Sequence, residues 1–155
     1  MNEDVLIELH PSQGRRLFAA MTMGMLAMIL VYLAFLVAPA FLWSAAFLLG
    51  GLATGWLGWW QFQSSAGVIE LTRESVRMQN GPTLAQVAEI EAVERGAFAM
   101  KPSQGFLLRL SQPLPRAYVP GLYWRIGRRL GIGGVTHAGQ AKAMAQTIEA
   151  LLAER

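Results

Sequence analysis

A long apolar stretch dominates the first half of the chain. From Leu17 to Ile69 the sequence contains no Asp, Glu, Lys, Arg or His. Pro39 divides this stretch into two segments, each close to the roughly 20 apolar residues that a helix needs to cross a bilayer. The pattern therefore predicts a transmembrane helical hairpin over residues 17–62, after an N-terminal segment of residues 1–16.

The second apolar segment carries signs of a membrane interface and of helix packing. Trp43 lies near its start and Trp60 at its end, where indole rings prefer the headgroup level. Gly51, Gly55 and Gly58 recur along it, and the first two have the GxxxG spacing that lets another helix backbone approach closely. We expect these glycines to pack against the first segment, with a homodimer or another membrane subunit as the alternative.

The charges flanking the hairpin predict its orientation. Arg15 and Arg16 precede the first segment, Arg73 and Arg77 follow the second, and the turn at Pro39 is uncharged. Because cytoplasmic loops carry an excess of Lys and Arg, both termini are expected in the cytoplasm.

A twin-arginine signal peptide is the alternative explanation for Arg15 and Arg16. Ala38-Pro39-Ala40 would then provide a small-residue cleavage site. The apolar segment is longer than the core of about 7–15 residues that signal peptides have, which favours an uncleaved anchor.

Alternating polar and apolar residues follow the hairpin. Residues 67–72 and 75–80 show the strand period on either side of Arg73-Glu74, so they predict two strands joined by a tight turn. Residues 83–94 fit both a helical and a strand period, and we favour a strand with a short helical lead-in.

Further strands are predicted at residues 98–100, 105–110 and 116–119. Pro113 and Pro115 lie between the last two. Because proline cannot donate a hydrogen bond within a central ladder, residues 112–115 are expected to form a loop.

The C-terminal residues 141–152 repeat apolar side chains with i, i+3, i+4, i+7 spacing, which predicts an amphipathic helix. Thr136 can cap it. The polar face has Lys142 as its one cation, which favours packing across the open end of a small barrel over lying on a bilayer.

The composition agrees with an integral membrane protein. Of 155 residues, 54% are hydrophobic and 15% are charged, against roughly 25% charged in soluble domains. Absence of cysteine excludes disulfides, thiol nucleophiles and thiolate metal sites. The net charge of +3 is mild and the basic residues are scattered, so nucleic acid is not an expected partner.

Two stretches of the C-terminal part carry a family resemblance. Residues 67–76 are similar to an opening β-hairpin, and residues 123–134 look like the late strand and turn before a closing helix. Together with the membrane helices, they resemble the bacterial membrane proteins that carry a pleckstrin-homology-like (PH-like) domain, here residues 67–155. The resemblance implies a seven-stranded curled sheet capped by a helix, a scaffold or assembly role, and no shared catalytic residue.

The fold class predicted from pattern and resemblance is an α+β membrane protein. An N-terminal two-helix transmembrane hairpin precedes a small antiparallel PH-like barrel or sandwich, which a C-terminal amphipathic helix closes.

The densest cationic and aromatic group is the candidate contact site for lipid or a partner, made of Tyr123, Trp124, Arg125, Arg128 and Arg129. Near a bilayer, each cation attracts anionic headgroups by about 1 kcal/mol. On a strand, Arg125 and Arg129 share one face and Arg128 points to the other. Solvated or intradomain pairing, lipid contact and partner contact all remain open interpretations.

No reactive constellation stands out. Glycines at residues 131–134 lack nucleotide-binding spacing and predict a turn instead. His10 and His137 have no companion at metal-ligand spacing, and the carboxylates of residues 89–94 fit a solvated edge. We therefore predict no catalytic residue, cofactor or metal, and no enzyme.

The sequence thus favours a noncatalytic scaffold or accessory subunit, multi-pass in the bacterial inner membrane. Its cytoplasmic domain would bind a protein partner or lipid headgroups. Membrane lipids and a membrane protein or second copy are the expected partners, and no small-molecule substrate is inferred. The alternative is a component of a membrane enzyme or transporter whose active site another chain completes.

Overall fold

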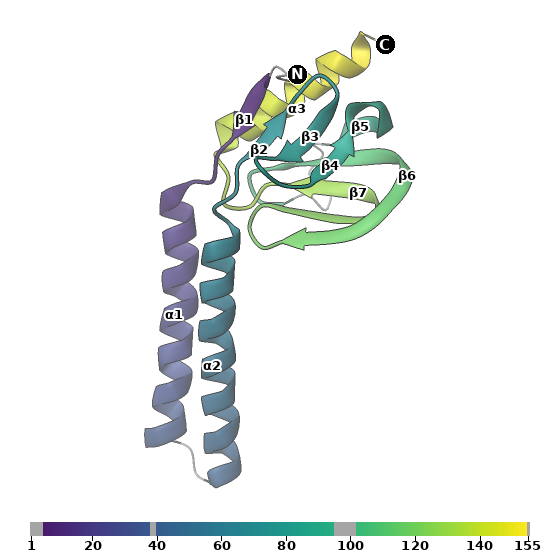
Figure 1. Cartoon of the computed structure of the whole chain (residues 1–155). Helices are drawn as coiled ribbons and strands as arrows, with labels where there is room; N and C mark the ends of the chain where they lie inside the picture. The colour runs from purple at the N-terminus through teal and green to yellow at the C-terminus, as the bar shows by residue number, and fades with distance from the viewer. Residues whose placement is uncertain (1–4, 38–39, 95–101, 155) are drawn as a thin grey trace. The chain divides into compact units, whose positions relative to one another are not determined.

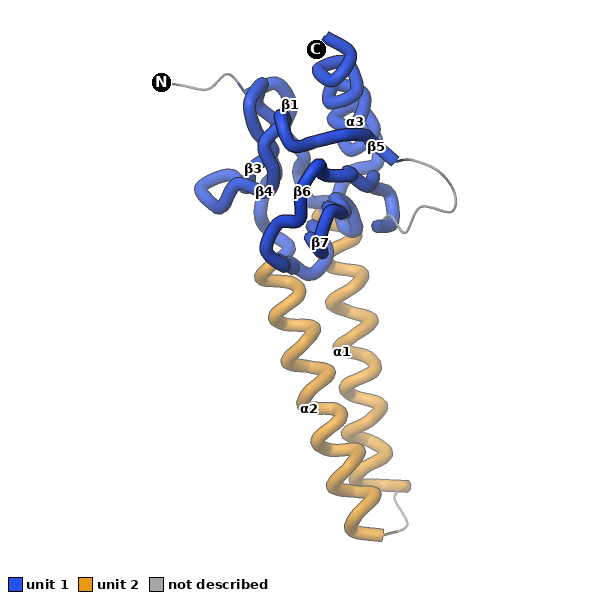
Figure 2. The backbone as a smooth tube through the Cα atoms, turned by 90° about the vertical axis from the view of Figure 1, so that its right-hand side faces the viewer, with its two compact units in different colours: residues 1–12, 65–155 blue, residues 13–64 orange. Residues whose placement is uncertain are grey.

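The computed structural model of the protein describes residues 5–37, 40–94 and 102–154. The chain forms two compact units (Figure 2). Gln13–Ser64 make a helical unit, and Met1–Ser12 together with Ser65–Arg155 make a unit of strands and one helix, called the sheet unit below. The strand predicted at residues 98–100 falls outside the described residues.

The helical unit consists of α1 (Gln13–Leu36) and α2 (Phe41–Ser64), which run side by side in opposite directions (Figure 1). Both helices are long and apolar enough to cross a membrane. Many of their large apolar side chains point outward, and Phe35 and Leu42 are 72% and 78% exposed. Because exposed apolar surface of this extent is unfavourable in water, the unit suits a lipid environment.

The first sheet of the sheet unit has four antiparallel strands in sequence order. These are β1 (Ile7–Leu9), β2 (Ile69–Leu71), β3 (Ser75–Met78) and β4 (Thr83–Gln86). The predicted hairpin around Arg73-Glu74 is confirmed as β2 and β3.

Strand β1 was not predicted, although its three residues alternate between the two faces: Glu8 is exposed, whereas Leu9 is buried. It pairs with β2, with Ile7 opposite Leu71 and Leu9 opposite Ile69. The helical hairpin is therefore an insertion between two neighbouring strands of one sheet.

The second sheet contains β5 (Ile90–Glu94), β6 (Phe106–Val119) and β7 (Tyr123–Ile132), with β6 in the middle. A 3₁₀ turn, η1 (Val87–Glu89), leads from β4 into β5. The ambiguous segment 83–94 is thus two strands on either side of one helical turn, rather than one strand with a helical lead-in.

The predicted loop at residues 112–115 is wrong, because β6 continues through both prolines. Pairing with β5 ends at Leu110, so among the described residues the later part of β6 pairs with β7 on one side and with no strand on the other. The ladder with β7 also shifts register around Leu114. Proline is tolerated at such edges and irregularities because no ladder hydrogen bond is lost there.

Helix α3 (Ala138–Ala153) packs on β1 of the first sheet and on β5 and β6 of the second (Figure 1). It directs Ala141, Met144, Ala145 and Ile148 into one core that both sheets share. The described strands form two separate antiparallel sheets. Of the two predicted forms, a barrel or a sandwich, the barrel is therefore wrong for the described residues. The turn η1 separates β4 from β5, and the chain does not close into a barrel within the described residues.

Thr136 does not cap α3 as predicted, because His137 occupies the N-cap position. Thr136 instead forms an isolated antiparallel bridge with Pro11. Its fully buried hydroxyl has no hydrogen-bond partner within the described part of the chain.

Candidate functional site

Ser12 and Ser65, the residues on either side of the helical insertion, contact two neighbouring segments of the sheet unit, the β7–α3 connection and the β6–β7 turn. The N–H of Ser12 donates to the carbonyl of Val135 at 2.6 Å, and the N–H of Val135 donates to the carbonyl of Gly121 at 2.9 Å. Gly121, with a φ of +79°, lies against Ser65, since a Cβ atom built on it would be 3.4 Å from the Cβ of Ser65. Ser12 and Ser65 are thereby linked through Val135 of the β7–α3 connection and Gly121 of the β6–β7 turn.

The predicted candidate site divides between the interior and the surface. Tyr123 is buried, and burial raises the pKa of its phenol above the ordinary value while the charge of Arg125 acts in the opposite direction. Trp124 is half-buried, and its indole packs over Gly131, where a Cβ atom would clash with the ring.

Arg125 binds backbone carbonyls of both sheets. Its Nε donates to the carbonyl of Pro115 at 2.8 Å, and its Nη1 donates to that of Leu84 in β4 at 2.5 Å. This arginine therefore has a structural role within the sheet unit.

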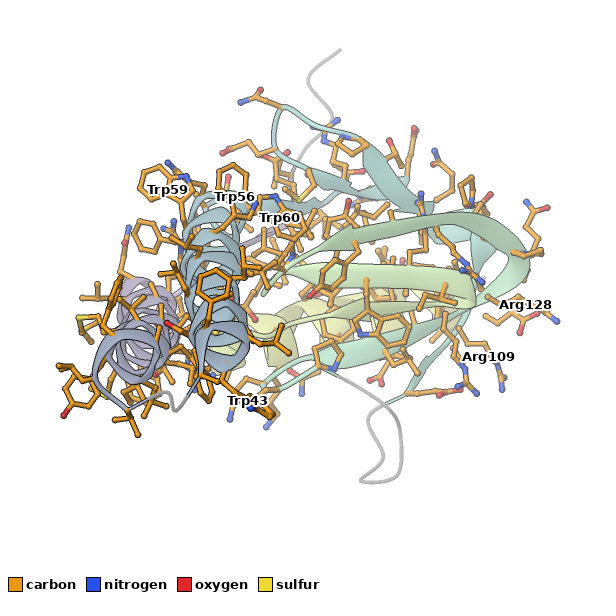
Figure 3. All side chains as sticks on the ribbon, turned by 90° about the horizontal axis from the view of Figure 1, so that it is seen from below. Trp43, Trp56, Trp59, Trp60, Arg109 and Arg128 are labelled. Atoms are coloured by element: carbon orange, nitrogen blue, oxygen red, sulfur yellow. The ribbon has the colours of Figure 1, made fainter. Side chains whose placement is uncertain are left out.

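Arg128 is also occupied within the unit. It donates to the carbonyl of Leu110 at 3.0 Å and to Glu91 at 3.0 Å. Glu91 also pairs with Arg109 at 3.3 Å, and the labelled Arg109 and Arg128 lie near each other in Figure 3. Arg129, opposite Arg109 in the β6–β7 ladder, is exposed.

A surface that sequence reasoning missed lies on the outer face of the β6–β7 hairpin. Tyr118 stands opposite Trp124 in the register and is 63% exposed. Arg116 and Ile126 are also exposed, and Ile126 is 55% accessible. A shallow hollow of about 280 Å³ is lined by Arg116, Ala117, Tyr118, Trp124, Arg125 and Ile126.

The signal for this surface was present in the sequence as alternation. Arg116 and Tyr118 are two residues apart, as are Trp124 and Ile126, so each pair occupies one face of a strand. Separate strands were predicted at residues 105–110 and 116–119, whereas the structure has one strand, β6, that carries Arg116 and Tyr118 and pairs with β7.

The predicted glycines of α2 differ in what they contact. A Cβ atom on Gly51 would lie 2.9 Å from Val31 and 3.1 Å from the carbonyl of Ala27, and one on Gly58 would lie 2.8 Å from Met23. A Cβ atom on Gly55 would lie 3.7 Å from the Cβ of Ala27, which is an ordinary van der Waals contact. Gly51 and Gly58 thus let α1 and α2 approach closely.

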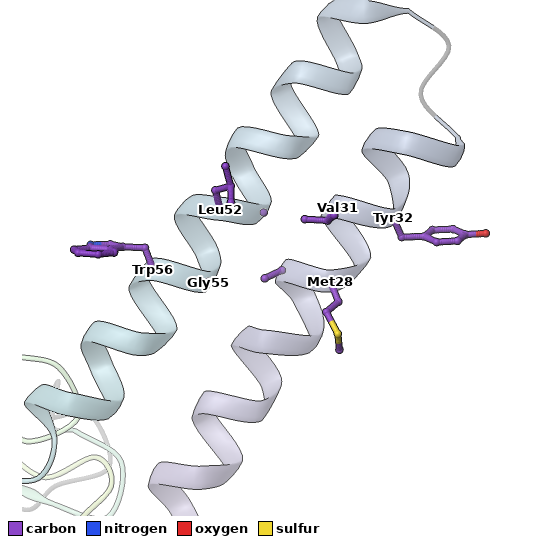
Figure 4. Close-up of a pocket in the computed structure, with 8 residues that line it drawn as sticks. Met28, Val31, Tyr32, Leu52, Gly55 and Trp56 are labelled. Carbon is purple, nitrogen blue, oxygen red and sulfur yellow. The ribbon is translucent and has the colours of Figure 1, made fainter.

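An apolar groove of about 620 Å³ runs along the helical unit (Figure 4). Val31 points across towards α2, whereas Tyr32 and Trp56 point outward (Figure 4). A second hollow of about 330 Å³ shares Gly55 with the groove. These mostly apolar walls suit lipid chains or another helix.

Polar contacts tie the two helices together at both ends of the unit. The Arg16 guanidinium donates to the carbonyl of Phe62 at 2.6 Å and lies 4.7 Å from the centre of its ring. This charge also complements the negative end of α2. At the opposite end, the hydroxyl of Ser44 donates to the carbonyl of Ala34 at 2.5 Å.

The tryptophans of α2 form two exposed groups (Figure 3). Trp43 lies in the first turn, and Trp56, Trp59 and Trp60 lie near the C-terminal end. Trp43 and Trp59 are about 24 Å apart along the axis at 1.5 Å per residue. This spacing is comparable to the hydrocarbon thickness of about 30 Å, as expected for interfacial tryptophans if α2 spans a bilayer.

Histidines and carboxylates make local contacts. His10 pairs with Glu8 at 2.9 Å, and the N–H of His137 donates to the carbonyl of His10 at 3.4 Å, which ties β1 to the start of α3. Within the described ranges, no three His, Cys, Asp or Glu side chains gather as a metal site would require.

Glycines 133 and 134 have positive φ values at the β7–α3 connection, as the predicted turn requires.

Comparisons of the chain with protein-family models, with curated proteins and with solved structures found no match.

Proposed function

We propose that this protein is a noncatalytic scaffold or accessory subunit anchored in the bacterial inner membrane. Its sheet unit, taken as a PH-like domain, presents a contact surface to a protein partner or to lipid headgroups. Seven strands and a closing helix, counted over the described residues, support that comparison, although they form two sheets.

The observation that carries the proposal is the position of the helical hairpin between β1 and β2. Because these strands are hydrogen-bonded neighbours, residues 7–9 and 69–71 must fold in the same compartment. An even number of crossings satisfies this condition, and α1 and α2 supply two helices of suitable length and polarity. The sheet unit is then held to the bilayer through two covalent links instead of one.

The flanking charges support a cytoplasmic position for the sheet unit. Arg15 and Arg16 lie at one end of the hairpin, and Arg73 and Arg77 follow the other. The positive-inside rule favours the cytoplasm for segments of this kind.

Native-membrane purification tests the scaffold role. We expect the tagged full-length chain to sediment with membranes and, in mild detergent, to elute with a stoichiometric partner or as an oligomer larger than the 17.0 kDa chain. The matched control replaces residues 13–64 by a short loop and should lose membrane association. Consistent recovery of the full-length chain as a monomer without any partner would contradict the scaffold and accessory-subunit role, and retention of the control variant on membranes would contradict anchoring by the hairpin.

A further inference from the structure

We propose that the outer face of the β6–β7 hairpin docks on the anionic headgroup surface of the bilayer that holds the helical unit. This docking face consists of Arg116, Tyr118, Trp124 and Ile126. The inference rests on the proposed membrane anchoring and deepens it by naming the lipid contact.

The register brings these four side chains to one face of the hairpin. Tyr118 and Trp124 are direct partners, and Ala117 pairs with Arg125 on the opposite face. Because alternate residues of a strand share a face, Arg116 joins Tyr118 and Ile126 joins Trp124. Two amphipathic aromatic rings, an exposed isoleucine and a guanidinium make a surface typical of a membrane–water interface.

The charge of the hairpin is complementary to anionic lipid. Its strands contain five arginines and no Asp or Glu. Near β5, Glu91 pairs with Arg109 and Arg128, and Glu94 also pairs with Arg109. Near the turn, Arg116 has no ion pair among the residues that the structure describes, and Arg125 binds neutral carbonyls. Arg116 therefore contributes a positive charge to the docking face that no described carboxylate neutralises, while the exposed Arg129 lies farther along β7, opposite Arg109.

The chain itself keeps this face near the bilayer. Gly121 in the β6–β7 turn lies against Ser65, which directly follows the last residue of α2. Ile126 is five residues from Gly121, about 17 Å at 3.3 Å per residue. The covalent link thus holds the docking face within reach of the headgroups and raises its effective concentration there, so a weak contact is sufficient.

The small size of the docking face favours a bilayer over a stable protein partner. A specific protein–protein interface uses about 20–30 residues on each side. Four residues around a shallow hollow are far fewer, whereas shallow insertion of aromatic and aliphatic side chains between headgroups needs no matching partner shape.

Hydrogen–deuterium exchange of the full-length chain in lipid nanodiscs tests this inference. One set of discs contains neutral phosphatidylcholine, and the other also contains anionic phosphatidylglycerol. We expect peptides covering residues 115–126 to exchange more slowly in the anionic discs. Loss of one cation should weaken the contact about fivefold, the equivalent of about 1 kcal/mol.

Arg116→Glu and Ile126→Ser should each remove the lipid-dependent protection without changing exchange in the buried strands. The matched control is Lys142→Glu, which makes the same charge change on an exposed residue of α3. It should retain the protection. Having two independent variants of the docking face keeps the test valid if one of them folds poorly.

Equal exchange in neutral and anionic discs would overturn the docking inference while leaving membrane anchoring intact. Loss of protection in Lys142→Glu as well as in Arg116→Glu would overturn it too. So would protection in native membranes that is absent in lipid discs, because a protein partner would then cover the docking face. Failure of the chain to enter discs at all would contradict the anchoring on which both proposals depend.

Discussion

Arg125 joins the two sheets through the backbone of Leu84. Its guanidinium donates to the Leu84 carbonyl at 2.5 Å and to the Pro115 carbonyl at 2.8 Å. Leu84 belongs to β4 of the first sheet, and Arg125 belongs to β7 of the second. One side chain on the inner side of the hairpin therefore bridges two ladders that are separate within the described residues.

Replacing Arg125 by methionine should destabilise the sheet unit, because two carbonyls lose their donor while the apolar stem is retained. We expect the free energy of unfolding to fall by about 1–3 kcal/mol, measured by denaturant titration with circular dichroism. Arg129→Met, at an exposed position of the same strand, should change it by less than about 0.5 kcal/mol. Equal effects of the two substitutions would show that the carbonyl contacts of Arg125 are unimportant.

The helix–helix contact at Gly51 predicts a specific steric effect. In Gly51→Ala, the new methyl group would meet Val31 at 2.9 Å, so the helices must separate and stability should fall by about 1–3 kcal/mol. Gly24→Ala is the control, because a Cβ atom there has nothing within 4 Å and alanine favours the helix. Unfolding in mixed detergent micelles measures both, and a Gly51→Ala variant as stable as Gly24→Ala would refute close packing.

Burial of the Tyr123 phenol predicts alkaline sensitivity. Its pKa is raised in the folded state by loss of solvation, so the folded protein holds this proton more tightly than the unfolded chain. The corresponding stability is fully present below the unfolded pKa of about 10 and is lost as the pH rises through the folded value. Tyr123→Phe should flatten the fall of the melting temperature above that pH, and an unchanged slope would exclude this role.

Excision of the helical insertion should leave a folded, soluble sheet unit. Ser12 and Ser65 are connected through Val135 and Gly121, so a loop of about 4–6 residues in place of residues 13–64 should let β1 keep its pairing with β2. Amide exchange of Ile7 and Leu71 by NMR provides the measurement. Rapid exchange at Ile7 in an otherwise folded unit would mean that the insertion is needed to hold β1 in place.

The elements that could be predicted from the sequence depend on local patterns. The apolar stretch gave both long helices, and the alternation around Arg73-Glu74 gave β2 and β3. Strand β1 was missed because its partner is distant in sequence, on the far side of the helical hairpin, and a three-residue strand has almost no periodic signal. Its place in the sheet comes from long-range pairing and burial of Leu9.

The candidate site was predicted only in part for a similar reason. Residue type was enough to identify Trp124 and Arg125 as candidates. It could not predict that Arg125 binds backbone carbonyls, or that Trp124 shares the outer face of the hairpin with Tyr118. Among the described residues, β6 beyond Leu110 has no partner strand on one side, which accommodates Pro113 and Pro115, and a local rule about proline cannot anticipate which edge of a strand lacks a partner.

The most direct test of the account is the sidedness of single cysteines in intact cells, since the chain has none of its own. With an impermeant maleimide, Ala40→Cys should be labelled from outside, whereas Glu8→Cys and Lys142→Cys should be labelled only after the inner membrane is permeabilised. Labelling of Glu8→Cys and Lys142→Cys from opposite sides, or of all three from the same side, would contradict a membrane-spanning hairpin inserted between β1 and β2.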